Sequence, residues 1–274
     1  MRIATAQNRI LGDPKANGRE IRELMCMARD AGAELIHFPE GAISGYVKSQ
    51  IRSWEEVNWE LLRKEIEKTA ALAGNLGLWV VLGSNHRLSQ PNRPHNSLYI
   101  FSPDGELHTR YDKQLCSNSE INDWYTPGRE NVVFDVSGWR FGCSLCIEIQ
   151  FPELFLEYER QAIDCMLFSS FSESEMFRIQ AQAYAAINNY WFSFSVPTQC
   201  SANAPSSMIG PSGEIVSSCH PVESGFTIST LDRDAPEWEV AIKRARPWRR
   251  LARTGDIYET KHVNDSRSRA RHVF

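Results

Sequence analysis

The chain has no long hydrophobic run. No stretch of about 18 consecutive apolar residues occurs in its 274 residues, so the sequence predicts no membrane-spanning helix. The first seven residues, Met-Arg-Ile-Ala-Thr-Ala-Gln, lack the long apolar segment of a signal peptide and are typical of a strand. The seven cysteines are an odd number at irregular spacing, which favours a reducing compartment over a disulfide framework. We therefore expect a cytoplasmic protein with no membrane partner.

The chain also lacks an overall excess of positive charge. Its 30 Lys and Arg residues face 34 Asp and Glu residues, and the net charge of −4 argues against a surface built for nucleic acid. The charge is uneven, because residues 243–274 carry +7 and residues 1–242 carry −11. We predict that this basic arm docks on the acidic body or on a partner copy of it. Nucleic-acid binding by the arm stays open as an alternative.

Hydrophobic patterning predicts an α/β fold. The composition, 42% hydrophobic and 23% charged, excludes disorder, collagen or coiled coil as descriptions of the whole chain. Strands are expected at 2–7, 34–38, 78–83, 97–102, 107–111, 132–136, 140–146, 165–169, 191–196, 207–209, 215–217 and 226–231, and helices at 17–31, 54–74, 153–161 and 175–188. The two halves therefore predict two stacked sheets with helices on both outer faces. We expect one domain over residues 1–242 and an arm over 243–274.

Three polar signals follow predicted strands, where open α/β sheets place their sites. Glu40 lies in His-Phe-Pro-Glu-Gly, and partial desolvation there raises a carboxyl pKa toward that of a general base. Lys113 ends a hairpin strand, and a buried ammonium can neutralise an oxyanion and lower the pKa of a nearby thiol. Cys146 closes a strand just before a helix, so its thiol is expected at the carboxyl edge of the sheet. Each residue alone is also compatible with a purely structural role.

Two other chemistries compete for the cysteine. Cys143 and Cys146 match the C-x-x-C spacing, but inside a strand residues three apart face opposite sides, and no second such pair supplies a zinc site. A Cys–His hydrolase lacks a sequence signature here, although spatial pairing with one of the seven histidines stays open. A glutamate base, a lysine cation and a cysteine nucleophile are together what an amide hydrolase without histidine needs.

Five motifs in order resemble the nitrilase superfamily of carbon–nitrogen hydrolases. They are Phe38-Pro-Glu40 with Gly45-Tyr46, Tyr111-Asp-Lys113, Thr126-Pro-Gly128, Cys146-Ile-Glu148 with Phe151-Pro-Glu153, and Ile209-Gly-Pro-Ser-Gly-Glu214. The resemblance implies a four-layer αββα sandwich of two mixed sheets, which dimerises with C-terminal arms crossing the dimer. It implies no cofactor and no metal.

The resemblance also implies roles for particular residues. Glu40 would be the general base, Lys113 the oxyanion stabiliser and Cys146 the nucleophile. Glu120 falls where the family has a second glutamate that contacts the lysine and the substrate, and the backbone N–H of Ile147 would help hold the oxyanion. Ile147-Glu148 fits neither the amidase nor the nitrilase pattern fully, whereas the following Phe-Pro-Glu favours amidases.

We therefore predict a hydrolase that cleaves a non-peptide C–N bond of a small linear amide or N-carbamoyl compound through a cysteine thioester. Glu173, in the loop after strand 165–169, is expected to select a cationic substrate, with a helix-capping role as the alternative. Nitrile hydrolysis by the same three residues and a non-catalytic, nucleic-acid-associated protein remain alternative functions. The expected partners are a small-molecule substrate and further copies of the chain, as a homodimer or higher oligomer.

Overall fold

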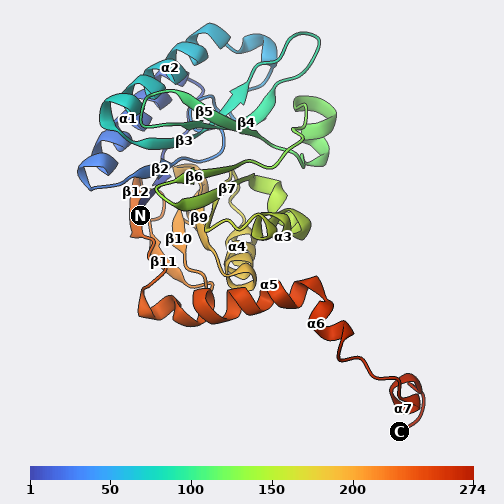
Figure 1. Cartoon of the computed structure of the whole chain (residues 1–274). Coiled ribbons are helices and arrows are strands. Elements are labelled where there is room, and N and C mark those ends of the chain that lie inside the picture. The colour runs from blue at the N-terminus through green and yellow to red at the C-terminus, as the bar shows by residue number, and fades with distance from the viewer. The chain divides into compact units, whose positions relative to one another are not determined.

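The computed structural model describes residues 1–274 and divides them into two compact units, Met1–Asp232 and Arg233–Phe274 (Figure 1). The first unit contains two six-stranded mixed sheets. The alternation of strand and helix in the sequence therefore gives the predicted α/β sandwich.

The first sheet runs in the order β12-β1-β2-β3-β4-β5. Its strands are β1 (Arg2–Gln7), β2 (Leu35–His37), β3 (Trp79–His86), β4 (His95–Phe101), β5 (Leu107–Asp112) and β12 (Gly225–Thr230). β1, β2 and β3 are parallel, and β3, β4 and β5 form an antiparallel meander. β12 pairs antiparallel with β1, so the last strand of the unit returns to the first sheet.

The second sheet runs in the order β11-β10-β9-β8-β7-β6. Its strands are β6 (Val133–Val136), β7 (Trp139–Leu145), β8 (Cys165–Ser169), β9 (Trp191–Ser195), β10 (Ser207–Ile209) and β11 (Ile215–Ser218). β7, β8 and β9 are parallel, so the chain leaves all three at the same edge of the sheet. This edge carries Cys146 directly after β7 and Ser170 directly after β8.

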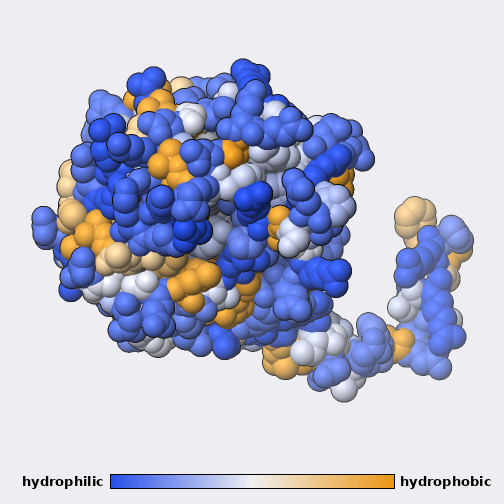
Figure 2. All heavy atoms as spheres, turned by 90° about the horizontal axis from the view of Figure 1, so that it is seen from above, coloured by the Kyte–Doolittle hydropathy of each residue, from blue (hydrophilic) through white to orange (hydrophobic).

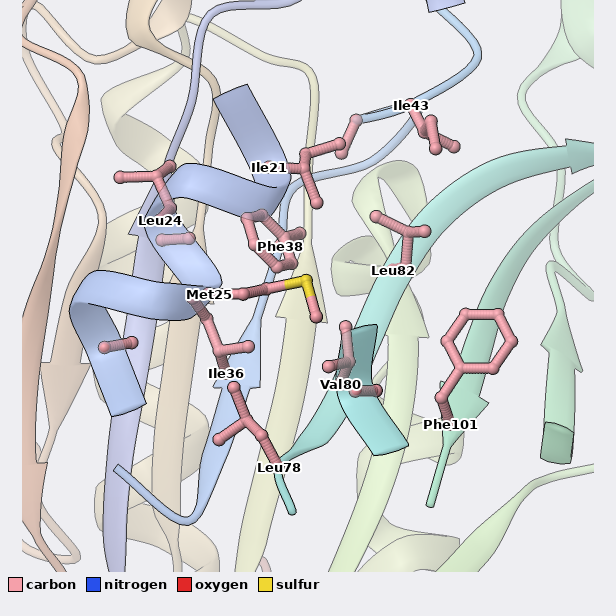
Figure 3. Close-up of a cluster of buried hydrophobic side chains, with 14 of the residues drawn as sticks. Ile21, Leu24, Met25, Ile36, Phe38, Ile43, Leu78, Val80, Leu82 and Phe101 are labelled. Atoms are coloured by element: carbon pink, nitrogen blue, oxygen red, sulfur yellow. The ribbon is translucent and has the colours of Figure 1, made fainter. Parts of the chain in front are cut away.

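Four helices form the two outer layers: α1 (Pro14–Asp30), α2 (Trp59–Leu76), α3 (Pro152–Arg160) and α4 (Glu175–Asn188). The buried side chains of α1 and α2 pack on the first sheet, as Figure 3 shows for Ile21, Leu24 and Met25 against Ile36 and Val80. Those of α3 and α4 pack on the second sheet in the same way. The single helix expected over 54–74 is wrong, because a 3-10 turn, Trp54–Glu56, precedes α2 and the side chain of Asn58 caps that helix.

Polar side chains join the two sheets. The imidazole of His37 in β2 contacts the hydroxyls of Ser193 and Ser169 at 2.8 and 2.7 Å, and Thr5 contacts Ser193 at 2.7 Å. The Ser195 hydroxyl donates to the carbonyl of Ala6 at 2.7 Å. Burial lowers the pKa of His37 to about 3, so this imidazole is neutral at physiological pH. These contacts hold the two sheets in one relative position beneath the edge that carries the candidate site.

The second unit consists of short helical segments. They are a 3-10 turn (Pro236–Trp238), a π-helical segment (Glu239–Ala245), α5 (Arg246–Thr254), α6 (Asp256–Glu259) and α7 (Ser266–Arg269). Pro247 lies in the first turn of α5, directly after the π-helical segment. Trp248 and Leu251 of α5 and Tyr258 of α6 are about half exposed. Hydrophobic residues form small separate groups on the mainly hydrophilic face of the molecule in Figure 2. None of the helices is both long enough and apolar enough to cross a membrane.

Candidate active site

Glu40 lies in the turn after β2 and is fully buried. Its Oε1 accepts hydrogen bonds from Asn96 Nδ2 at 2.7 Å and Lys113 Nζ at 3.1 Å, and its Oε2 accepts from the backbone N–H of Phe171 at 2.8 Å. Burial raises the pKa of this carboxyl, although Lys113 opposes the shift. A carboxylate that gains a proton more easily than usual is suited to act as a general base.

Gly83 of β3 allows the Glu40 turn to pack on the sheet. A Cβ at this position would lie 2.0 Å from the carbonyl oxygen of Pro39 and 3.0 Å from the Cα of Glu40. The carbonyl of Gly83 accepts a hydrogen bond from the N–H of Ile43 at 3.1 Å. Any larger residue at position 83 would therefore push the turn, and the carboxylate with it, away from the sheet.

Lys113 follows β5 and is also buried. Its ammonium lies between two carboxylates, 3.1 Å from Glu40 and 2.8 Å from Glu120. Burial alone would lower the pKa of Lys113, but the facing carboxylates and the Cys146 thiol raise it well above its usual value, so the side chain stays charged. Its carbonyl accepts from the N–H of Gly128 at 2.8 Å, and a Cβ at Gly128 would lie 2.2 Å from the carbonyl oxygen of Asp112.

Glu120 opens a short π-helical turn, Glu120–Trp124. Besides Lys113, it accepts hydrogen bonds from the Ser117 backbone N–H at 2.8 Å and the Tyr46 hydroxyl at 3.2 Å. Burial raises the pKa of Glu120, but Lys113 outweighs it and holds this pKa below the usual range. The two carboxylates on one ammonium thus differ: the pKa of Glu120 is lowered, which favours its ionised form, whereas the pKa of Glu40 is raised.

Cys146 is the first residue after β7, not the last residue of that strand. It opens a 3-10 turn, Cys146–Gln150, with a backbone φ of 50°, which is rare for residues other than glycine and marks a strained position. Its side chain shares the site with Glu40 and Lys113, since both act electrostatically on the thiol.

Lys113 lowers the pKa of the Cys146 thiol, as expected, but this effect does not decide the net shift. Burial, and after it the charge of Glu40, raise the pKa of Cys146 well above its usual value, and the opposing effect of Lys113 is smaller. Only 7% of the residue's surface is exposed. The side chain of Cys146 is therefore a neutral thiol at rest, and it would need a base to react as a nucleophile.

Glu148, which the sequence did not single out as a site residue, connects the turn that begins at Cys146 to the loop after Lys113. Its buried carboxylate accepts from the Tyr111 hydroxyl at 2.8 Å and from the backbone N–H of Leu145 at 2.7 Å. It also accepts from the N–H groups of Gln114 and Leu115 at 2.7 and 3.0 Å. The only local signal was its place two residues after the cysteine.

The two remaining predicted site residues, Ile147 and Glu173, lie in different parts of the chain. Ile147 is the second residue of the 3-10 turn, and the first N–H groups of such a turn have no acceptor within it. Glu173 is exposed in the loop before α4 and makes no capping hydrogen bond, although its charge reaches Cys200 and raises the pKa of that thiol. The rings of Tyr46 and Phe171 stack with their centroids 4.6 Å apart. Tyr46 bonds to Glu120 and Phe171 to Glu40, so this stack lies beside the two carboxylates.

All seven cysteines are free. No group of three or more His, Cys, Asp or Glu side chains is placed to hold a metal ion. Glu40, Lys113, Glu120 and Cys146 are the buried ionisable groups that the structure brings together at the edge of the two sheets.

The sandwich of two mixed sheets is the fold of the nitrilase superfamily. The chain matches the family model of carbon–nitrogen hydrolases over residues 2–239 and belongs to that family. The resemblance inferred from the five motifs is thereby confirmed.

Two curated relatives match over part of their length. A hydrolase of Mycobacterium tuberculosis is 29% identical over 168 residues, which are 59% of this chain and 58% of the relative. The deaminated glutathione amidase of Yersinia enterocolitica is 28% identical over 147 residues, which are 49% of this chain and 50% of the relative. The chain thus spans between half and three fifths of these relatives.

Among solved structures, an amidase from Nesterenkonia sp. AN1 has a TM-score of 0.77 at 22% identity. The match covers 92% of this chain and 99% of the amidase. At this identity the likeness concerns the fold, and it agrees with the predicted sandwich of two mixed sheets.

Proposed function

We propose that the protein is an amidase that hydrolyses a small linear amide or N-carbamoyl compound through a thioester on Cys146. One observation carries the proposal: a buried ammonium, Lys113, lies between a carboxylate that can take up a proton, Glu40, and one that stays ionised, Glu120, next to a neutral thiol. The relatives named as amidases support amide hydrolysis over other C–N chemistry.

In the first half of the reaction, Glu40 removes the proton from Cys146 while the sulfur attacks the substrate carbonyl carbon. The negative charge that develops on the carbonyl oxygen is stabilised by Lys113 and by the backbone N–H of Ile147. Protonated Glu40 then gives its proton to the departing nitrogen. The C–N bond breaks, ammonia or an amine leaves, and the acyl group remains on sulfur as a thioester.

In the second half, Glu40 removes a proton from a water molecule that attacks the thioester carbonyl. The new C–O bond forms, the C–S bond breaks and the thiol recovers its proton from Glu40. One role of Glu120 follows from its lowered pKa: it keeps Lys113 protonated and positioned throughout, because the ammonium retains one ionised partner while Glu40 carries the proton. A mutant of the Nesterenkonia amidase has been crystallised with the acetamide moiety of fluoroacetamide added to its active-site cysteine, which supports a reactive thiol at this place in the fold.

The aromatic stack of Tyr46 and Phe171 favours a flat, short substrate group next to Cys146. Glu173 is proposed to attract an amine or other cation at the far end of the substrate, since it is exposed, unpaired and close enough to act on Cys200. Nitriles would be attacked by the same thiol, and they serve as a comparison class in the test below.

The test is an ammonia-release screen over short amides, N-carbamoyl amines and nitriles, with Cys146→Ala as the blank. We expect turnover of at least one amide or carbamoyl compound, and none by the variant. A mass increase of the acyl group on Cys146, trapped by rapid acid quenching, would identify the thioester. Turnover by Cys146→Ala, or turnover of nitriles alone, would contradict the proposal.

We further propose that the protein works as a homodimer. The side chains of Met176 and Ile179 on α4 are about half exposed, and Ala183 continues the same helix face. An apolar face of this kind suits a contact between copies. The second unit carries basic residues and half-exposed Trp248 and Leu251, so its complementary charge suits the acidic body of a partner copy.

A further inference from the structure

Ser170 has a buried hydroxyl without a protein partner. The residue directly follows β8 and none of its surface is exposed. Its backbone N–H donates to the carbonyl of Ser195 at 2.9 Å, but its Oγ makes no hydrogen bond. A buried polar group left unpaired destabilises a folded protein, so a native structure that keeps one calls for an explanation.

The position of Ser170 supplies that explanation. The next residue, Phe171, donates its backbone N–H to Glu40 at 2.8 Å, so the chain at this point runs beside the proposed general base. The parallel strands β7 and β8 pair Leu145 with Ser169, so the residues that follow them, Cys146 and Ser170, are neighbours at the edge of the sheet. Burial and then Glu40 raise the pKa of the Cys146 thiol, and the Ser170 side chain is near enough to oppose them. The unpaired hydroxyl thus lies beside the thiol that must become negative during the proposed reaction.

We propose that Ser170 is a further catalytic residue, whose hydroxyl donates a hydrogen bond to the sulfur of Cys146 as the thiolate forms. This inference rests on the proposed thioester mechanism. A neutral thiol sulfur is a weak acceptor, whereas a thiolate accepts a strong, charge-assisted hydrogen bond. The thiol proton goes to Glu40 and Ser170 keeps its own, so the hydroxyl gains a partner only along the reaction path. Such an interaction accelerates the chemical step, because it is absent in the resting enzyme.

Other groups around the thiol do not replace this hydrogen bond. Those that act on Cys146 or face it from the neighbouring loops are Glu40, Lys113, Glu120 and Tyr46. Lys113 is already paired with two carboxylates, and the Tyr46 hydroxyl donates to Glu120. Ser170 is the neutral side chain near the thiol whose hydroxyl hydrogen has no acceptor.

The test compares Ser170→Ala with Ser144→Ala in the full chain. Ser144 is an equally buried serine of β7, two residues before Cys146, whose hydroxyl contacts the sulfur of Met166 at 3.4 Å. The probe is iodoacetamide, with labelling of Cys146 followed by mass spectrometry across a pH series. For Ser170→Ala we expect labelling about 10-fold slower at neutral pH, which is a rise of about 1 pH unit in the midpoint of the profile. Ser144→Ala should label like the wild type.

Thermal unfolding separates catalysis from structure. Because Ser170→Ala removes an unpaired polar group, its melting temperature should equal or exceed that of the wild type while its reactivity falls. Ser170→Thr, which keeps the hydroxyl, should restore labelling at least in part. Wild-type labelling rates in Ser170→Ala, or a lowered melting temperature with no rescue by threonine, would overturn the role of Ser170. If the wild type releases no ammonia from any amide or carbamoyl compound, the proposed function fails instead.

Discussion

Replacing Lys113 by methionine removes the one charge that separates Glu40 from Glu120 while keeping the volume of the side chain. At distances of 3.1 and 2.8 Å, each ion pair contributes roughly 5–6 kcal/mol of Coulomb attraction at an effective dielectric constant of about 20. Much of this attraction offsets the cost of burying the charges. The net loss on removing one partner of a buried cluster is about 3–5 kcal/mol, because the remaining charges stay buried without compensation.

The assay is urea or thermal unfolding of the variant at pH 7. For a unit of this size, a loss of 3–5 kcal/mol lowers the melting temperature by about 6–20 °C. The matched control is Lys68→Met, since Lys68 also lies 2.7 Å from a buried carboxylate, that of Glu65, but is itself mostly exposed. An exposed cation of this kind contributes about 1 kcal/mol or less. Equal stability of the two variants would refute the view that Lys113 holds the carboxylates together.

The pH dependence gives a second check on Lys113→Met. Without the ammonium, the folded-state pKa of Glu40 lies further above its unfolded value of about 4.5. A group with a raised folded-state pKa favours the folded state below the unfolded pKa, and this contribution is lost as pH rises. The stability deficit of the variant should therefore shrink toward pH 4.5 and grow toward pH 7. Adding Glu120→Gln should recover part of the deficit, because it removes one of the two unpaired charges.

Four further outcomes follow from the structure. Glu40→Gln should keep its melting temperature within a few degrees, while its rate of ammonia release falls about 10²–10⁴-fold because the proposed base is lost. A wild-type rate would contradict this role. His37 has a folded-state pKa of about 3, below its unfolded value of about 6.5. Acid should therefore destabilise the fold from pH 6.5 downward by about 1.4 kcal/mol per pH unit, and His37→Gln should show a shallower pH dependence of unfolding than the wild type. Truncation after Asp232 should lower the oligomeric mass measured by light scattering, whereas an unchanged mass with weaker nucleic-acid binding would favour a nucleic-acid arm. Glu173→Lys should weaken turnover of an amine-bearing amide far more than that of a neutral amide of equal length, and equal effects would contradict a selective role.

Much of the scaffold could be predicted because local periodicity and burial agree. The strand Cys165–Ser169 and the helix Glu175–Asn188 have the predicted bounds, since an apolar run and a regular apolar face determine each of them. The helix break near Asn58 was missed, because a capping side chain decides it and the apolar spacing does not. The pairing of β12 with β1 depends on residues more than 200 positions apart, which no local pattern specifies.

The ionisable residues of the candidate site could be predicted from the sequence, but the net shifts of their pKa values could not. Glu40, Lys113 and Cys146 each follow a strand, and the topology brings these strand ends together. The lowering effect of Lys113 on the Cys146 pKa could be predicted, but the net rise could not, because it depends on how deeply the thiol is buried. Ser170 and Asn96 approach the site from other strands, and their ordinary sequence surroundings gave no sign of this.

Gly83 and Gly128 set a limit on how this enzyme can change through evolution or engineering. Neither residue carries a reactive group, yet a single added carbon at either would collide with the backbone that carries Glu40 or Lys113. Saturation mutagenesis should therefore find these two positions as intolerant as the reacting residues themselves. Positions 171 and 173, by contrast, lie in the loop after β8, and under the proposed function substitutions there would alter substrate choice without moving Glu40 or Lys113. The capacity for new specificities lies in that loop.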